Sequence, residues 1–274
     1  MLPVLTAYRW EVRKLLAQRR SWLGIAAAAA GPIIFLISIQ ISAITPGHGP
    51  YDTPLGPNLR DTGLTLDLVV TKLVAIVGPT LVAALVAGDI VASEEAGGTL
   101  KTILVRSLRR WHVLAGKALA VFSYLLAALV TFAVVGIGVA VIAWGFHPVV
   151  NLSGHTVSAG SALGLTLLSL VFYGLPTLAI AAFALFLSVA TRNSVAAVAG
   201  TLLYALVWQG LDALSAIASA HPYLLYAQFR AWHGLYQTPH DLHLLVRDVW
   251  VSAIFTIIPL VAAVIIFNRR DVDT

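Results

Sequence analysis

The sequence predicts an all-α, polytopic membrane protein that forms a single transmembrane domain over residues 1–274, with six membrane-spanning helices. Hydrophobic residues make up 59% of the chain and charged residues only 11%, whereas a soluble domain carries roughly 25% charged residues. The mean hydropathy is +0.90. The apolar residues are also gathered into six stretches, each long enough to cross a hydrocarbon core about 30 Å thick.

The expected spans are separated by loops that hold most of the charges. With an even number of spans both chain ends share one side of the membrane, and 13 of the 17 Lys and Arg residues lie on that side. Because cytoplasmic segments carry the excess of Lys and Arg, both termini are expected in the cytoplasm. We place the protein in the plasma membrane, and the basic excess needs no nucleic acid partner to explain it. The spans are expected at 22–44, 68–91, 117–144, 162–190, 194–220 and 245–267.

Two helix starts have chemical support. Ser194 can cap the fifth span after a tight turn at 191–193. Thr238-Pro239 followed by Asp241 is typical of a helix start, so the sixth span is expected to begin near Pro239.

Residues 2–20 are predicted to form an amphipathic helix that lies in the membrane interface. Apolar side chains recur along it at three- and four-residue spacing, at Leu5, Tyr8, Val12 and Leu15 or Leu16. Basic residues occupy the other faces, and the tryptophans at 10 and 22 suit an interface. The simpler alternative is a solvated basic segment that only sets the topology. The basic residues assigned to the interfacial helix are Arg9, Arg13 and Lys14.

The segment between the second and third spans carries the most information. Its acidic pair, Glu94 and Glu95, comes just after the span, and the glycines at 97–98 permit a tight break. Thr99 can then cap a short helix that has apolar side chains on one face. A helix of this kind can fit a socket on a partner protein. Periodicity alone leaves an ordinary connecting loop as the alternative.

The same segment resembles the motif of the ABC-2 family of exporter permeases. The shared pattern is E-x-x-G-T-L-x-x-[IL]-L followed by an arginine and then G-K, carried here by Glu95, Gly98, Thr99, Leu100, Ile103, Leu104, Arg110, Gly116 and Lys117. The chain departs from the family at Ser107-Leu108, where the family often has a proline. The resemblance implies a cytoplasmic coupling helix that contacts a separate ABC ATP-binding subunit, with the N-terminal amphipathic helix beside it. The residues assigned to ATPase coupling on this basis are Glu94, Glu95, Gly98, Thr99, Leu100, Ile103, Leu104, Arg106 and Arg110.

The chain carries no ATP-binding motif. A P-loop needs G-x-x-x-x-G-K-[ST], but Lys117 is followed by Ala118, and Trp111 stands where the first glycine belongs. We therefore expect a transport subunit that is not an enzyme and binds no cofactor, with ATP and Mg²⁺ held by the partner subunit. The absence of cysteine excludes disulfides and thiolate metal sites, and no catalytic or metal-binding residue is assigned.

Polar side chains follow one stripe of the fifth span. Asp212 is its clearest intramembrane charge, and such charges often mark functional sites. The stripe is expected either to line a translocation path or to form interhelical hydrogen bonds worth on the order of 0.6–2 kcal/mol each. Its members are Thr201, Tyr204, Trp208, Gln209, Asp212 and Ser215.

Together these features predict the membrane-spanning permease subunit of an ATP-driven ABC-2-type exporter. Its expected partners are the ATP-binding subunit, a second copy of itself or a homologous permease, and membrane lipid. An ion-coupled secondary transporter that works without an ATPase is the alternative, although the sequence shows neither an internal repeat nor paired broken helices.

Overall fold

The chain is almost entirely helical in the computed structural model, which describes residues 2–42, 64, 78–96, 109–214, 216 and 218–269. Five of the described helices are long and apolar enough to cross a membrane. The protein is therefore a helical membrane protein, as its composition predicts. The five helices are α2 (Arg19–Ser42), α7 (Arg110–Trp144), α8 (Ala159–Thr191), α9 (Ser194–Asp212) and α11 (Leu242–Arg269).

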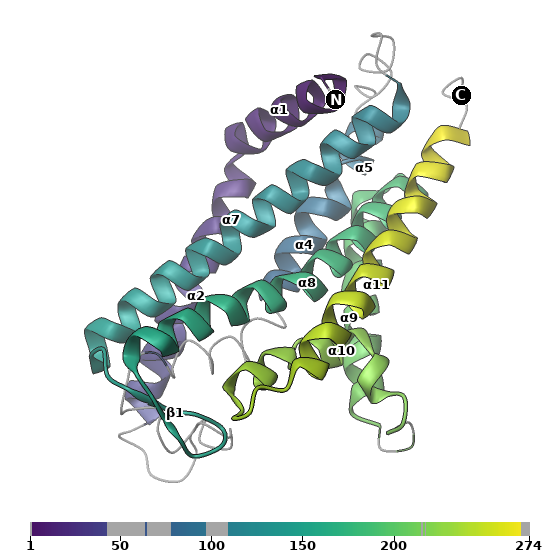
Figure 1. Cartoon of the computed structure of the whole chain (residues 1–274). Coiled ribbons are helices and arrows are strands. Elements are labelled where there is room, and N and C mark those ends of the chain that lie inside the picture. The colour runs from purple at the N-terminus through teal and green to yellow at the C-terminus, as the bar shows by residue number, and fades with distance from the viewer. Residues whose placement is uncertain are drawn as a thin grey trace.

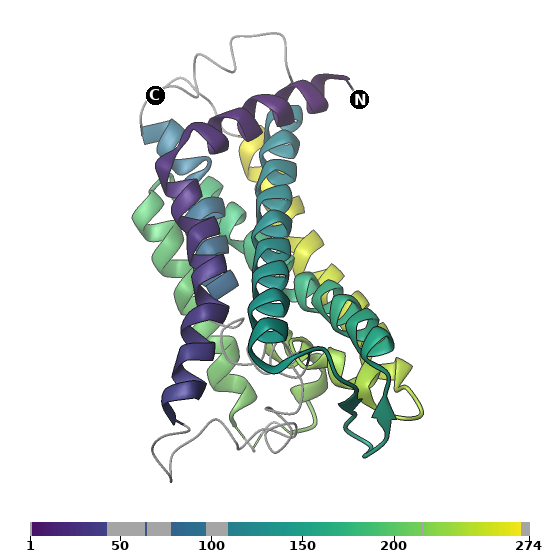
Figure 2. The ribbon, with the colours of Figure 1, turned by 90° about the vertical axis from the view of Figure 1, so that its left-hand side faces the viewer.

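The long helices run between two ends of an elongated bundle (Figure 1). At one end, α1 (Leu2–Ala17) crosses over the ends of α2 and α7 instead of running along them (Figure 2). We call this the α1 end; α7 begins there and α11 finishes there (Figure 1). The opposite end is the loop end. It holds the antiparallel pair β1 (Val149–Val150) and β2 (Thr156–Val157) and the short helices η3 (His221–Tyr223), α10 (Leu225–Gln228) and η4 (Ala231–Tyr236).

The described helices match the predicted spans with changes at their ends. The third, fourth and sixth spans fall in α7, α8 and α11, and the first falls in α2 except for 43–44, which lie outside the described residues. The second is described as α4 (Gly78–Asp89), followed by the short α5 (Ala92–Ala96), while 68–77 lies outside the described residues. The fifth span ends at Asp212 and not at 220. At this end the Asp212 carboxylate forms an ion pair with Arg230 of the returning segment.

The two predicted helix starts are displaced by one to three residues. Asn193, and not Ser194, caps α9, because its side-chain oxygen accepts the backbone N–H groups two and three residues further on. Ser194 is already the first helical residue. α11 begins at Leu242 and not near Pro239. It follows Asp241, whose carboxylate accepts a backbone N–H of the first turn at 3.0 Å.

α8 forms the centre of the bundle. Fifteen of its residues are buried, and alanines among residues 179–184 allow neighbouring helices to approach closely. It packs against α4, α9 and α11. α9 lies at the periphery, with only Ala197 and Thr201 buried.

α1 packs on α7 through one face. Ala7 and Glu11 are buried there, and Gly116 of α7 leaves room for them, because a Cβ at that position would lie 2.6 Å from Ala7 Cβ. Two members of the predicted apolar stripe, Leu5 and Leu16, are instead 46% and 57% exposed. The apolar residues of α1 are thus divided between a protein-facing side and an exposed side.

Candidate functional site: a buried charge cluster

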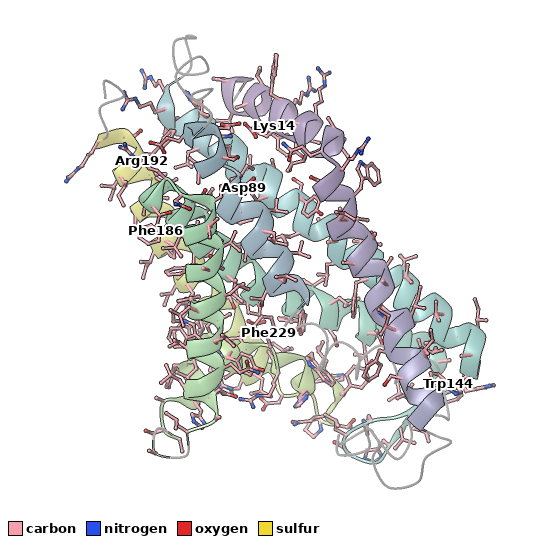
Figure 3. All side chains as sticks on the ribbon, turned by 180° about the vertical axis from the view of Figure 1, so that it is seen from behind. Lys14, Asp89, Trp144, Phe186, Arg192 and Phe229 are labelled. Carbon is pink, nitrogen blue, oxygen red and sulfur yellow. The ribbon has the colours of Figure 1, made fainter. Side chains whose placement is uncertain are left out.

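Separate parts of the chain meet at the α1 end around one buried lysine, Lys117 of α7. Its side chain is fully buried although it carries an ammonium group. α1, α5 and the residue after α4 supply its partners. The same end of the bundle holds Lys14, Asp89 and Arg192, as Figure 3 shows.

The Lys117 ammonium group has three acceptors. Its Nζ lies 2.8 Å from Glu11 Oε1 in α1, 2.6 Å from Glu94 Oε2 in α5 and 3.1 Å from the carbonyl oxygen of Ile90. The contacts with Glu11 and Ile90 are hydrogen bonds, and the contact with Glu94 is an ion pair. Lys117 therefore joins three parts of the chain that are far apart in sequence.

Glu94 is shared between two lysines. Its other carboxylate oxygen pairs with Lys14 of α1. Burial opposes the ionisation of Glu94, but the charges of Lys117 and Lys14 outweigh it and lower the pKa of this carboxyl below its ordinary value. We call Glu11, Lys14, Glu94 and Lys117 the charge cluster. Its two positive and two negative side chains balance, which is the condition under which buried charges are tolerated.

A second set of contacts ties this region to the turn between α8 and α9. Arg192 Nε lies 2.8 Å from Glu95 Oε1. Ser194 Oγ donates to Asp89 Oδ1 at 2.5 Å. Ser188 Oγ accepts two backbone N–H groups, at 3.2 and 3.0 Å, where α4 passes into α5. The acidic pair is therefore bonded, directly or through its neighbours, to α1, α7, α8 and α9.

The structure brings two of the predicted coupling residues into this site. Glu94 and Glu95 form the ion pairs just described, and Arg110 is the first residue of α7 at the same end. The remaining predicted coupling residues lie outside the described residues: Gly98, Thr99, Leu100, Ile103, Leu104 and Arg106.

The basic residues assigned to the interfacial helix have different surroundings. Lys14 turns into the charge cluster, whereas Arg9 and Arg13 are exposed. Sequence reasoning assigned no role to Glu11, although a signal was present. Glu11 stands four residues from both Ala7 and Leu15, so it shares the face of α1 that turns towards the protein.

The first three residues of the predicted α9 stripe are buried or pack against neighbouring helices. Thr201 is buried, and its hydroxyl bonds back to its own helix at 2.8 Å. Tyr204 stacks on Phe183 with ring centroids 3.8 Å apart. Trp208 packs edge-on against Phe255 at 5.0 Å. These side chains hold α9 to its neighbours.

The loop-end part of the stripe is polar and paired. Gln209 Nε2 donates to the Tyr226 hydroxyl at 3.2 Å, and Asp212 Oδ1 lies 2.7 Å from an Arg230 nitrogen. Burial raises the pKa of the Tyr226 hydroxyl, so it remains neutral. Ser215 lies outside the described residues. The Asp212 charge is therefore neutralised by the segment that connects α9 to α11.

A cavity of about 300 Å³ lies beside these contacts, between α4, α8, α9 and α10. Its walls are mainly apolar, with Thr80, Gln209 and Tyr226 as polar members. This volume is at the lower end of the roughly 300–1,000 Å³ typical of small-molecule sites. Leu81 and Leu206 on its walls are 42% and 62% exposed, so the cavity opens on the bundle surface between α4 and α9.

One buried carboxyl group lies apart from both regions. Asp248 of α11 is fully buried, and its Oδ1 accepts a hydrogen bond from Ser252 at 2.8 Å. Its Oδ2 has no hydrogen-bond partner among the described residues. Asp248 is not among the predicted site residues. Within the part of the chain that the structure describes, no three His, Cys, Asp or Glu side chains gather as metal ligands would.

A family model matches most of the chain. The model described as "Protein of unknown function (DUF2705)" matches residues 50–272. The chain belongs to this family. The DUF2705 match includes Glu94, Lys117 and Arg192 but begins after α2, so the α1 members of the charge cluster lie outside it. No curated protein matches the chain.

Proposed function

We propose that this protein is the membrane-spanning permease subunit of an ATP-driven ABC-2-type exporter. It would have six spans in the plasma membrane and both termini in the cytoplasm, so that the α1 end faces the cytoplasm and α1 lies in the interface. The motif segment 97–109, nearly all of it outside the described residues, would hold the coupling helix that contacts a separate ATP-binding subunit. ATP and Mg²⁺ belong to that subunit. A second permease, identical or homologous, would complete the translocation path.

The charge cluster and its contacts to the α8–α9 turn carry this proposal. Glu94 and Glu95 stand directly before the motif segment and form ion pairs with Lys117, Lys14 and Arg192. A displacement of the motif segment would therefore reach α1, α7 and α9 through ion pairs at 2.6–2.8 Å as well as through the covalent chain. A coupling element needs this property, and an ordinary connecting loop does not.

The cavity and the polar end of the α9 stripe are the proposed place for the path. α9 connects this place to the α1 end, because its first residue, Ser194, bonds Asp89 and its last, Asp212, binds Arg230 near the cavity. A movement imposed at one end of α9 would therefore change the cavity at the other. Such coupling requires that the nucleotide state of the partner stabilises one arrangement more than the other.

Charge reversal in the Glu95–Arg192 pair tests the proposal in the reconstituted complex with the ATP-binding subunit. Glu95→Lys places two cations together and is expected to remove most of the stimulation of ATP hydrolysis by the permease. Adding Arg192→Glu restores an ion pair of opposite orientation and is expected to recover the stimulation. Asp241→Lys makes the same charge change at the loop end and serves as the control. Full stimulation in Glu95→Lys, or failure of any ATP-binding subunit to co-purify, would overturn the proposal.

An ion-coupled secondary transporter is the second candidate, and Asp248 is the observation that favours it. A buried carboxyl group inside a membrane helix is typical of ion and proton pathways, and Asp248 has no cationic partner in the part of the chain that the structure describes. The purified chain in vesicles without any ATPase distinguishes the two functions. Dissipation of an imposed proton or sodium gradient that Asp248→Asn abolishes and Asp212→Asn leaves intact would favour the secondary transporter.

A further inference from the structure

The exposed side of α1 combines positive charge with large apolar side chains. Arg9 and Arg13 are exposed, one helical turn apart. Leu5 and Leu16 are 46% and 57% exposed beside them. Neither guanidinium group has a hydrogen-bond or ion-pair partner among the described residues. Like charges one turn apart destabilise a helix by a few tenths of a kcal/mol, so an anion that binds between them would be favoured.

The apolar part of this side continues the exposed surface of α2. Trp22 at the start of α2 is 59% exposed, and its Nε1 donates to the carbonyl oxygen of Leu16 at 2.9 Å. Further along α2, Leu23 and Ile34 are 69% and 65% exposed. Since α2 is one of the helices that can cross a membrane, this surface faces hydrocarbon. Leu5 and Leu16 of α1 lie where the exposed apolar surface of α2 ends.

Arg9 and Arg13 lie next to Leu5 and Leu16, on the side of α1 away from the hydrocarbon. With about 100° between successive residues of a helix, Arg9 lies about 40° around α1 from Leu5, and Arg13 about 60° from Leu16. The opposite side of α1 is closed to ligands, because Ala7 and Glu11 are buried against the protein. With α1 in the membrane interface, as the proposed function places it, the guanidinium groups would lie at the depth of lipid headgroups, where phosphates are found.

We propose that Arg9 and Arg13 form a binding site for the headgroup of an anionic phospholipid, with Leu5, Leu16 and Trp22 against its acyl chains. Two unpaired guanidinium groups complement the phosphate geometrically as well as electrostatically, since each can donate two parallel hydrogen bonds. Lys14 takes no part, because it is bound to Glu94. This lipid site rests on the proposed function, which places α1 in the membrane interface. It adds to that function the class of lipid that α1 binds.

The test uses the full chain in phosphatidylcholine vesicles without an ATPase, with spin-labelled phosphatidylglycerol or spin-labelled phosphatidylcholine added. The ratio of the two labels immobilised at the protein surface measures selectivity for the anionic headgroup. A basic residue near a membrane surface changes the affinity for anionic lipid on the order of fivefold. The Arg9→Gln/Arg13→Gln variant is therefore expected to lose most of the selectivity. Arg269→Gln, an exposed arginine at the same end of the bundle, is expected to keep it.

A second measurement needs no substitution. The selectivity of the unaltered protein should fall as salt is raised, since exposed charges are screened over about 10 Å at 0.1 M. Equal selectivity in the double variant and the unaltered protein, an equal loss in Arg269→Gln, or selectivity that salt leaves unchanged would each overturn the site. Loss of ATP-binding-subunit affinity in the double variant with lipid selectivity intact would assign this surface to the ATPase instead. Because no ATPase is present in the lipid assay, its result is independent of the test of the exporter function.

Discussion

Removing the Lys117 ammonium group is the most direct perturbation of the charge cluster. In Lys117→Met the apolar stem is retained, but Glu11 loses its ion-pair partner while 7% exposed. Glu94 keeps Lys14. Breaking a buried ion pair on one side costs about 3–5 kcal/mol, because an uncompensated charge is left in the interior. We expect Lys117→Met to lower the free energy of unfolding by about this amount.

Two further variants separate charge compensation from simple packing. Lys14→Met removes a lysine that is 39% exposed, and solvent screening limits its cost to about 0–1 kcal/mol. Lys117→Met/Glu11→Met removes both members of the pair, so no charge is left alone. Since well-packed apolar replacements of buried pairs are often neutral, the double variant should recover about 2 kcal/mol or more relative to Lys117→Met.

The measurement is reversible unfolding by SDS in mixed micelles, followed by circular dichroism. It covers the unaltered protein, Lys117→Met, Glu11→Met and Lys117→Met/Glu11→Met, which form a double-mutant cycle, and also Lys14→Met. A Lys117→Met protein within about 1 kcal/mol of the unaltered protein would refute the reasoning, because a buried charge would then be tolerated without its partner. A double variant as unstable as the sum of its single changes would refute it as well, since the two residues would then act independently.

Three other predictions use the same unfolding assay. Gly116→Ala should destabilise by about 1–3 kcal/mol, because the new Cβ would lie 2.6 Å from Ala7 Cβ; Gly138→Ala in the same helix meets nothing within 4 Å and should be neutral or stabilising. Asn193→Ala should cost about 1 kcal/mol through loss of the α9 cap, whereas the exposed Asn268→Ala should cost much less. The lysine charges hold the Glu94 pKa below its ordinary 4.5, so the unfolded state takes up the proton first as pH falls. The unaltered protein should therefore lose stability below about pH 4.5 more steeply than Glu94→Gln, and parallel curves would contradict the assignment.

The spans could be predicted from sequence because the bilayer sets the length of an apolar helix. Runs of about 20 apolar residues locate α2, α7, α8 and α11 without reference to any other part of the chain. The end of α9 is predicted wrongly, because local apolarity does not report contacts with distant segments. α9 ends at Asp212, which pairs with Arg230 in another segment.

The charge cluster could be predicted only in part for the same physical reason. Periodicity indicates which face of α1 is apolar, but it does not indicate which helix covers that face. Lys14 meets Glu94 across 80 residues, and Lys117 meets Glu11 across 106. Lys117 is one of the 13 Lys and Arg residues that the predicted topology places on the cytoplasmic side, yet its side chain is fully buried. An acidic residue on the buried face of an amphipathic helix is the signal that such a partner exists.

The unequal burial of α8 and α9 determines which helix can be displaced at lower energetic cost. Fifteen residues of α8 are buried, whereas only Ala197 and Thr201 of α9 are buried. α9 is held at its two ends by Ser194 on Asp89 and by Asp212 on Arg230, and along its length by the rings of Tyr204 and Trp208. Displacing α9 therefore requires these few contacts to break, while α8 keeps its own buried surface. A rearrangement of the bundle should begin at α9, and breaking either of its two end contacts should lower the barrier to that movement.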